Sequence, residues 1–135
     1  MLEHISLYHE GHEYDRPSYV DVSKWINTLL NTEFKGRGIL LSQLENAMYE
    51  LVCGAGYISI KFLVSSERER YPFICRVPVE MIAFQPGRHP VVFLLHIIDG
   101  IVDELEIFTA DSSLIEREIS IINVEYKVAE SVKAN

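Results

Sequence analysis

The feature that most constrains the fold is an Asp-Gly dipeptide between two long β-type runs. Asp99-Gly100 separates the nearly all-apolar residues 91–98 from residues 101–109. A two-residue type I′ turn prefers Asp-Gly, because both of its central residues need positive φ. The sequence therefore predicts an antiparallel β-hairpin over residues 91–109, with its apolar first strand in the centre of a sheet.

The length of this turn fixes which residues face each other across the hairpin. Counting outward from the turn, His96 lies opposite Asp103 on a face that is otherwise apolar. Glu104 and Glu106 project from the other face, two residues apart and away from the expected core. The hairpin is therefore expected to present carboxylates to solvent.

Two segments before residue 54 show helical spacing. Apolar residues from Val22 to Leu30 recur at three- and four-residue steps, and Asp21 is a suitable N-cap. A second helix is predicted to begin at Ser42, where Ser-Gln-Leu-Glu matches the capping box, and to end at Gly54. The two helices would form a helical hairpin whose apolar face packs on another layer.

The rest of the chain has β-type patterns. Residues 57–64 alternate between apolar and polar side chains. Residues 73–84 are β-rich, but Pro78 has no N–H to donate, which predicts a broken or edge strand. Residues 119–128 are predicted to form a last strand, and a helix over 114–122 is the alternative.

These patterns predict the α+β class, with an N-terminal helical hairpin packed on a mostly antiparallel β-sheet. The 135 residues fit a single domain. Its parts are expected to be an irregular lead-in at 1–21 with a short strand near residues 5–8, the helical hairpin at 22–53, and the sheet at 57–128.

Composition argues against several classes of function. The chain has 12 Lys and Arg against 20 Asp and Glu, a net charge of −8. This balance disfavours direct binding to nucleic acid or to an anionic membrane, and favours a basic partner. We expect no signal peptide, since Met-Leu-Glu-His is neither basic nor apolar, and no membrane-spanning run. The expected compartment is the cytoplasm, where Cys53 and Cys75 stay reduced.

The excess acid is concentrated in two stretches. Residues 99–118 carry seven acids and one base, and residues 1–21 carry five acids and one base. Such a distribution is typical either of a solvated face that keeps a protein soluble or of a docking surface for a basic partner. Under the second hypothesis, the expected partner-binding residues are Asp103, Glu104, Glu106, Asp111, Glu116 and Glu118, followed by Glu10, Glu13 and Asp15.

No catalytic or metal-binding motif stands out. His96 opposite Asp103 would suit a general base, but the sequence places no nucleophile beside the pair. His9-Glu10-Gly11-His12-Glu13 is not a His-Glu-x-x-His motif and implies no third ligand. Cys75 is interpreted as a small buried hydrophobe. We therefore expect no enzyme, cofactor or metal; a small enzyme or ligand-binding domain using a His96/Asp103 pocket is an alternative.

Two parts of the chain, one in the predicted helices and one in the predicted strands, carry a family resemblance. The first is Trp25-Ile-Asn-Thr-Leu-Leu through Leu41-Ser-Gln-Leu-Glu-Asn-Ala, and the second is Arg76-Val-Pro-Val-Glu80, then Val91-Val-Phe-Leu-Leu-His-Ile-Ile-Asp-Gly100 with Glu104-Leu-Glu-Ile-Phe108. In this order, over roughly residues 22–116, the chain resembles small bacterial immunity proteins. Those proteins neutralise toxins of contact-dependent growth inhibition and other polymorphic toxin systems.

The resemblance implies a non-enzymatic role. The chain would form a tight stoichiometric complex with one cognate toxin C-terminal domain made in the same cell. Such toxins are often nucleases, whose basic substrate grooves suit an acidic inhibitor. A helical-hairpin adaptor domain is a further alternative, and an exposed apolar patch on the hairpin would favour it. The sequence does not indicate the oligomeric state.

Overall fold

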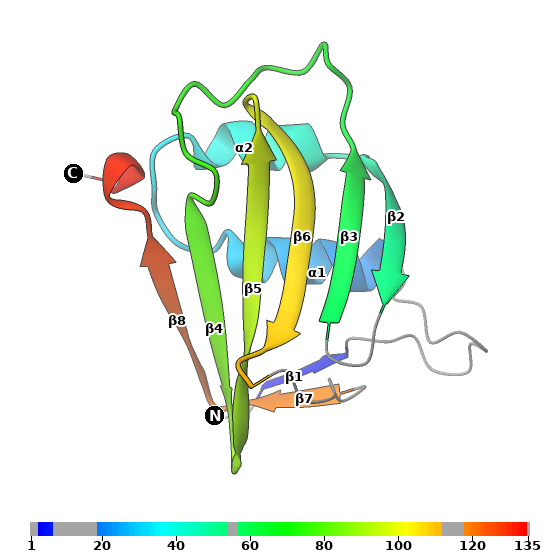
Figure 1. The fold of residues 1–135 in the computed structure, drawn as a ribbon, viewed down its shortest axis with the longest axis vertical. Coiled ribbons are helices and arrows are strands. Elements are labelled where there is room, and N and C mark those ends of the chain that lie inside the picture. The colour runs from blue at the N-terminus through cyan, green and yellow to red at the C-terminus, as the bar shows by residue number, and fades with distance from the viewer. Residues whose placement is uncertain (1–2, 7–18, 54–56, 112–117, 135) are drawn as a thin grey trace.

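The computed structural model describes the backbone of residues 3–6, 19–53, 57–111 and 118–134 (Figure 1). The α+β class predicted from the sequence is confirmed. A six-stranded antiparallel sheet carries two helices on one of its faces, which lie behind the strands in Figure 1. A separate two-stranded sheet lies at one end of the larger one.

The elements follow one another along the chain in a simple order. They are β1 (Glu3–Ser6), α1 (Tyr19–Leu29), α2 (Arg37–Leu44), β2 (Met48–Cys53), β3 (Tyr57–Leu63), β4 (Val79–Gln85), β5 (Arg88–Ile98), β6 (Ile101–Thr109), β7 (Glu118–Ile121), β8 (Asn123–Val128) and the 3₁₀ turn η1 (Glu130–Val132). The large sheet has the order β2-β3-β6-β5-β4-β8, and β1 pairs with β7. The β5–β6 hairpin therefore lies between β3 and β4, and β6 pairs with β3, a strand far from it in sequence.

The core lies between the large sheet and the two helices. The alternation predicted for β3 is confirmed, since Ile58, Ile60 and Phe62 are buried on its inner side. Trp25 and Leu29 of α1 are fully buried in the same cluster. The inner face of the sheet is thus covered, and the opposite face is formed by the alternate side chains.

The hairpin predicted at Asp99-Gly100 is present, but its register differs from the prediction. Both turn residues have positive φ, 51° and 78°, as a type I′ turn requires. Beyond the second pair of residues, β6 contains one extra residue, Asp103, and the pairing shifts. His96 lies opposite Glu104, so the predicted pairing of His96 with Asp103 is wrong.

The hydrophobic pattern explains this bulge. With the shift, Leu95 pairs with Leu105 and Phe93 with Ile107, and all four side chains are fully buried. The unshifted register would set Leu95 opposite Glu104 instead. A slip of one residue moves every side chain to the other face, so burial of the apolar set outweighs the regular ladder.

The second helix is shorter than predicted. It ends at Leu44, Asn46 follows with a φ of 58°, and Met48–Cys53 is strand β2, paired with β3. The helix predicted from Ser42 to Gly54 is therefore wrong in its second half, and Ser42 lies in the last turn of α2. Short apolar runs fit both periodicities, and here the pairing with β3 decides. Asp21 is also not an N-cap, because α1 begins at Tyr19.

The predicted last strand is two strands. β7 pairs with β1, whereas β8 pairs with β4 at the edge of the large sheet. Ile122 lies between the two strands and is 50% exposed. Tyr126 does face the helices and donates a hydrogen bond to the Thr28 carbonyl at 2.7 Å. The alternative helix is wrong where β7 stands, and its residues 114–117 lie outside the described residues.

Gln43 is a buried polar side chain that ties α2 to the β5–β6 turn. Its Nε2 donates to the carbonyl oxygens of Glu69 and Gly100, both at 2.8 Å. Its Oε1 accepts from the Val102 N–H, also at 2.8 Å. Since the side chain is 1% exposed, these bonds have no competition from bulk water. They fix the hairpin relative to the helical layer.

Tyr71 fastens the β3–β4 connection to the segment between the helices. Its hydroxyl donates to the Lys35 carbonyl at 2.6 Å. A Cβ at Gly36, where φ is 80°, would lie 2.4 Å from the Tyr71 ring, so only glycine permits this approach. Burial, with a smaller contribution from Cys75, raises the pKa of Tyr71 to about 12. The hydroxyl therefore stays protonated, and a donor, throughout the physiological pH range.

Candidate partner-binding face

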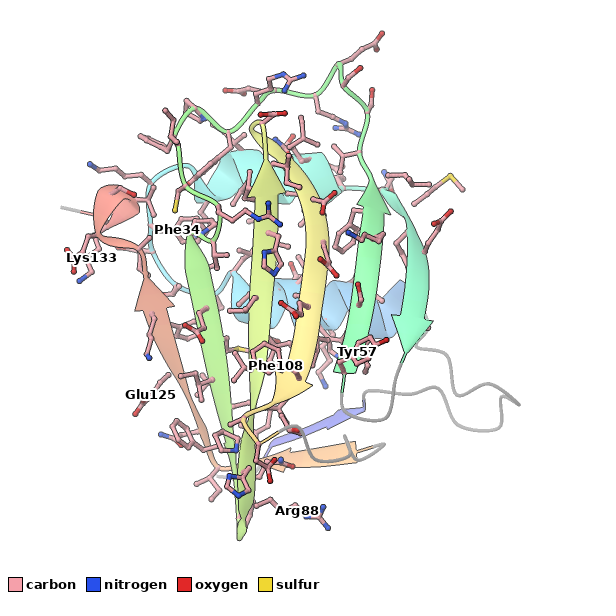
Figure 2. All side chains as sticks on the ribbon, viewed as in Figure 1. Phe34, Tyr57, Arg88, Phe108, Glu125 and Lys133 are labelled. Carbon is pink, nitrogen blue, oxygen red and sulfur yellow. The ribbon has the colours of Figure 1, made fainter. Side chains whose placement is uncertain are left out.

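The outer face is the side of the large sheet that faces away from the helices (Figure 2). Strand register arranges its side chains in rows across the sheet. The aromatic row consists of Tyr57, Phe108, Val92, Ile82 and Glu125. The middle row consists of Ser59, Glu106, Leu94, Glu80 and Lys127. The charged row consists of Glu50, Lys61, Glu104 and His96.

One lysine partly neutralises the acids at the charged end of this face. Lys61 Nζ lies 3.3 Å from Asp103 and 3.6 Å from Glu104. The hydrogen bond with Asp103 and the charge of Glu104 raise the pKa of Lys61 above its ordinary 10.5. Glu104 also accepts a hydrogen bond from the Ser59 hydroxyl. Its carboxylate is therefore held in place from β3.

His96 holds the second carboxylate. The Nε–H of Arg76 donates to His96 Nδ1 at 3.4 Å, which makes Nδ1 an acceptor. In the neutral ring the proton is then on Nε2, which lies 2.9 Å from Glu106 Oε1 and donates to it. Arg76, His96 and Glu106 thus form a chain of hydrogen bonds that fixes one oxygen of Glu106.

The structure brings three of the predicted site residues together. Glu104 and Glu106 project away from the core, as predicted, and Asp103 lies beside them in the bulge. Asp111 lies beyond the other end of β6, where it is 3.4 Å from His89. The backbone of Glu118 belongs to β7, and Glu10, Glu13, Asp15 and Glu116 lie outside the described residues.

Sequence reasoning missed the neighbours of these acids. Alternation along β3 does identify Ser59 and Lys61 as outward-facing residues. It gives no sign that β3 lies beside β6, because that pairing spans more than 40 residues. Arg76 lies in the irregular connection before β4, where no periodicity indicates its position. The face is consequently less acidic than the sequence suggests.

The alternative of a catalytic pair requires His96 to contact Asp103, but the two side chains bind other partners. His96 contacts Glu106 and Arg76, and Asp103 contacts Lys61. The hydroxyl of Ser59, on the neighbouring strand, donates its hydrogen to Glu104. Neither His96 nor Asp103 lines the two cavities described next.

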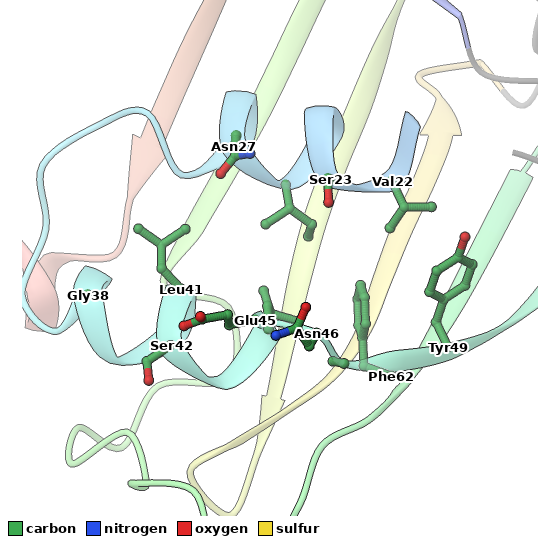
Figure 3. Close-up of a pocket in the computed structure, with 13 residues that line it drawn as sticks. Val22, Ser23, Asn27, Gly38, Leu41, Ser42, Glu45, Asn46, Tyr49 and Phe62 are labelled. Atoms are coloured by element: carbon green, nitrogen blue, oxygen red, sulfur yellow. The ribbon is translucent and has the colours of Figure 1, made fainter. Parts of the chain in front are cut away.

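A groove between the two helices is the second candidate site (Figure 3). It has a volume of about 460 Å³, within the range of small-molecule pockets. Its apolar lining includes Ile26, Leu41 and Phe62, and its polar rim includes Asn27 and Glu45. Val22 and Ile26 of α1, which line the groove, are buried in the core. A cavity of about 740 Å³ lies along β8, lined by Thr32, Glu33, Tyr126, Lys127, Val128, Lys133 and Ala134.

The described part of the chain contains no membrane-spanning helix and no cluster of candidate metal ligands. None of its helices is long and apolar enough to cross a membrane. Among the same residues, no three His, Cys, Asp or Glu side chains are grouped so that they could hold a metal ion. Comparison of the chain with protein-family models, with curated proteins and with solved structures finds no match.

Proposed function

We propose that this protein is an immunity-type inhibitor that binds one basic toxin domain, such as a nuclease domain, through its outer face. The observation that supports this most directly is the arrangement of Glu104 and Glu106. Both carboxylates stand on a rigid antiparallel sheet and are held by Ser59 and His96. Groups fixed before binding lose little conformational entropy on association, so their charge is available for recognition.

The remaining features of the fold have roles consistent with this proposal. The chain is a single immunity-type domain in which α1 and α2 act as a helical hairpin that backs the sheet. It acts in the cytoplasm, by stoichiometric binding, and without contact to nucleic acid or membrane. The acid excess steers the basic partner towards the face and raises the association rate. Aromatic side chains in the aromatic row supply much of the affinity.

A second candidate function is supported by the groove between α1 and α2. Its apolar lining and polar rim suit an adaptor domain that binds a partner or a ligand through its helices. The two candidates differ in the surface that they use. Glu45 stands on the rim of the groove, on the helical layer rather than the outer face, and therefore serves to distinguish them.

The proposal predicts that a toxin domain is encoded by the gene beside that of this protein, and it is tested with that domain. Co-expression is expected to yield a stable 1:1 complex. Lys61→Ser is expected to raise the association rate several-fold at low salt, because it removes the cation that competes with the partner for Asp103 and Glu104. Stopped-flow fluorescence measures the association rates of the wild type and of Lys61→Ser, each at low and at high salt.

Lys35→Ser is the matched control, since Lys35 is exposed and lies between α1 and α2, away from the outer face. It removes the same charge and is expected to change the rate much less. Equal rates for the two variants would contradict the use of the outer face. Failure of the two chains to form a complex would contradict the proposed function itself.

A further inference from the structure

Two aromatic side chains lie directly beside a fixed carboxylate on the outer face. Tyr57 on β3 and Phe108 on β6 are paired residues, and Figure 2 shows them next to each other. Tyr57 is 45% exposed, and Phe108 is half-buried. The next pair on this face is Ser59 and Glu106, roughly 7 Å further along the strands. An aromatic surface and a carboxylate are therefore within reach of one side chain.

This combination suits a guanidinium group better than an ammonium group. A guanidinium is planar and weakly hydrated, so it stacks on an aromatic ring while its N–H groups bind a carboxylate. An ammonium is compact and strongly hydrated, and gains less from the ring. The pair of aromatic rings thus adds a preference for arginine to the general attraction of the acids for any cation.

The carboxylate of Glu106 is held in a fixed position and remains accessible to a guanidinium group. His96 donates to Oε1, which fixes the side-chain rotamer, and the side chain of Glu106 remains 39% exposed. Each carboxylate oxygen has two acceptor positions, so a guanidinium can still bind both oxygens. Lys61 lies one row further along, where Asp103 and Glu104 pair with it. It therefore contributes little repulsion at the aromatic rings.

We propose that Tyr57, Phe108 and Glu106 form an arginine-binding site on the outer face. Its occupant is an arginine side chain of the basic partner, which stacks on the rings and binds the carboxylate. The identity of the partner rests on the proposed function. The preference for guanidinium over ammonium is a property of this chain alone and can be measured without the toxin domain.

The test uses two acetylated, amidated tripeptides, one of arginine and one of lysine, titrated into isotopically labelled protein. NMR chemical shifts of the Tyr57 and Phe108 rings report on stacking, and backbone shifts give the two affinities. The arginine peptide is expected to bind about three-fold tighter or better, the effect of a cation–π contact at an exposed site. Tyr57→Leu is expected to remove this preference and to retain weak, salt-sensitive binding of both peptides.

Glu106→Gln is expected to weaken both peptides, whereas Glu80→Gln, across the sheet in the same row, is the matched control and should change neither. Retention of the wild-type fold is checked from the backbone spectrum of each variant. Equal affinities for the two peptides would overturn the arginine site, as would a preference that survives in Tyr57→Leu.

The toxin domain separates this inference from the function on which it rests. If the arginine preference is present but the toxin domain does not bind, the site stands and the proposed function fails. If the toxin domain binds through the outer face and Tyr57→Leu leaves its affinity unchanged, the proposed function stands and the assignment of a toxin arginine as the occupant of the site is overturned. Both measurements use the full chain.

Discussion

Reversing two charges on the outer face, with Glu104→Lys and Glu106→Lys in one variant, is expected to weaken binding of the toxin domain by about 100-fold or more. Each substitution replaces an attractive contact with a repulsive one at a position where the carboxylate is fixed by the sheet. The loss should appear mainly as faster dissociation and partly as slower association. Surface-immobilised toxin domain and the purified variants allow both rates to be measured.

The matched control is Glu33→Lys with Glu45→Lys, which changes the net charge by the same amount. Both residues are exposed and lie on the helical side of the molecule. This control should bind almost as tightly as the wild type, because only long-range attraction is reduced. A loss confined to the control would contradict the outer-face account and favour the groove, on whose rim Glu45 stands.

The largest effect on stability is expected for Gln43→Leu. Leucine cannot bond the Val102 N–H or the carbonyl oxygens of Glu69 and Gly100, so a buried donor loses its side-chain partner and two acceptors lose a bond. An unsatisfied buried group costs about 1–3 kcal/mol, which predicts a total loss of about 3–5 kcal/mol in the free energy of unfolding. Urea denaturation monitored by Trp25 fluorescence measures the change.

Two further variants sharpen this test. Ser42→Ala changes an exposed neighbour on α2 and should alter stability by less than about 0.5 kcal/mol.

Gln43→Glu places a carboxylate against two carbonyl oxygens, so the folded state should raise the pKa of the introduced group. Its stability is therefore expected to rise as the pH falls through that raised pKa. If the Gln43→Leu protein is as stable as the wild type, the claim that the hydrogen bonds of Gln43 stabilise the fold is contradicted.

Much of the fold follows from local patterns. The alternation in β3 and the Asp99-Gly100 turn give the correct strands, the correct turn and the inward residues of β3. The bulge at Asp103 was not predictable from the turn alone, because it arises from burial of Leu95 and Leu105 on one face. α2 is shorter than its sequence spacing predicts for a related reason. The spacing from Leu44 to Val52 fits a helix, and only the pairing of β2 with β3 excludes it.

The candidate site was predictable only in part. Alternation within β6 is enough to turn Glu104 and Glu106 away from the core, even with the register of the hairpin misassigned. Their partners come from elsewhere in the chain. Ser59 and Lys61 arrive through the pairing of β3 with β6, and Arg76 through an irregular connection. Contacts of such long range depend on strand order, which periodicity does not encode.

The central claim is that the partner binds the outer face, and the surface it covers is the most direct test. Amide and side-chain NMR shifts of labelled protein, saturated with the toxin domain, map that surface. The account predicts the largest changes at Tyr57, Ser59, Glu104 and Glu106, with α1 and α2 little affected. Changes concentrated in the groove between α1 and α2, with these four residues unmoved, would contradict it.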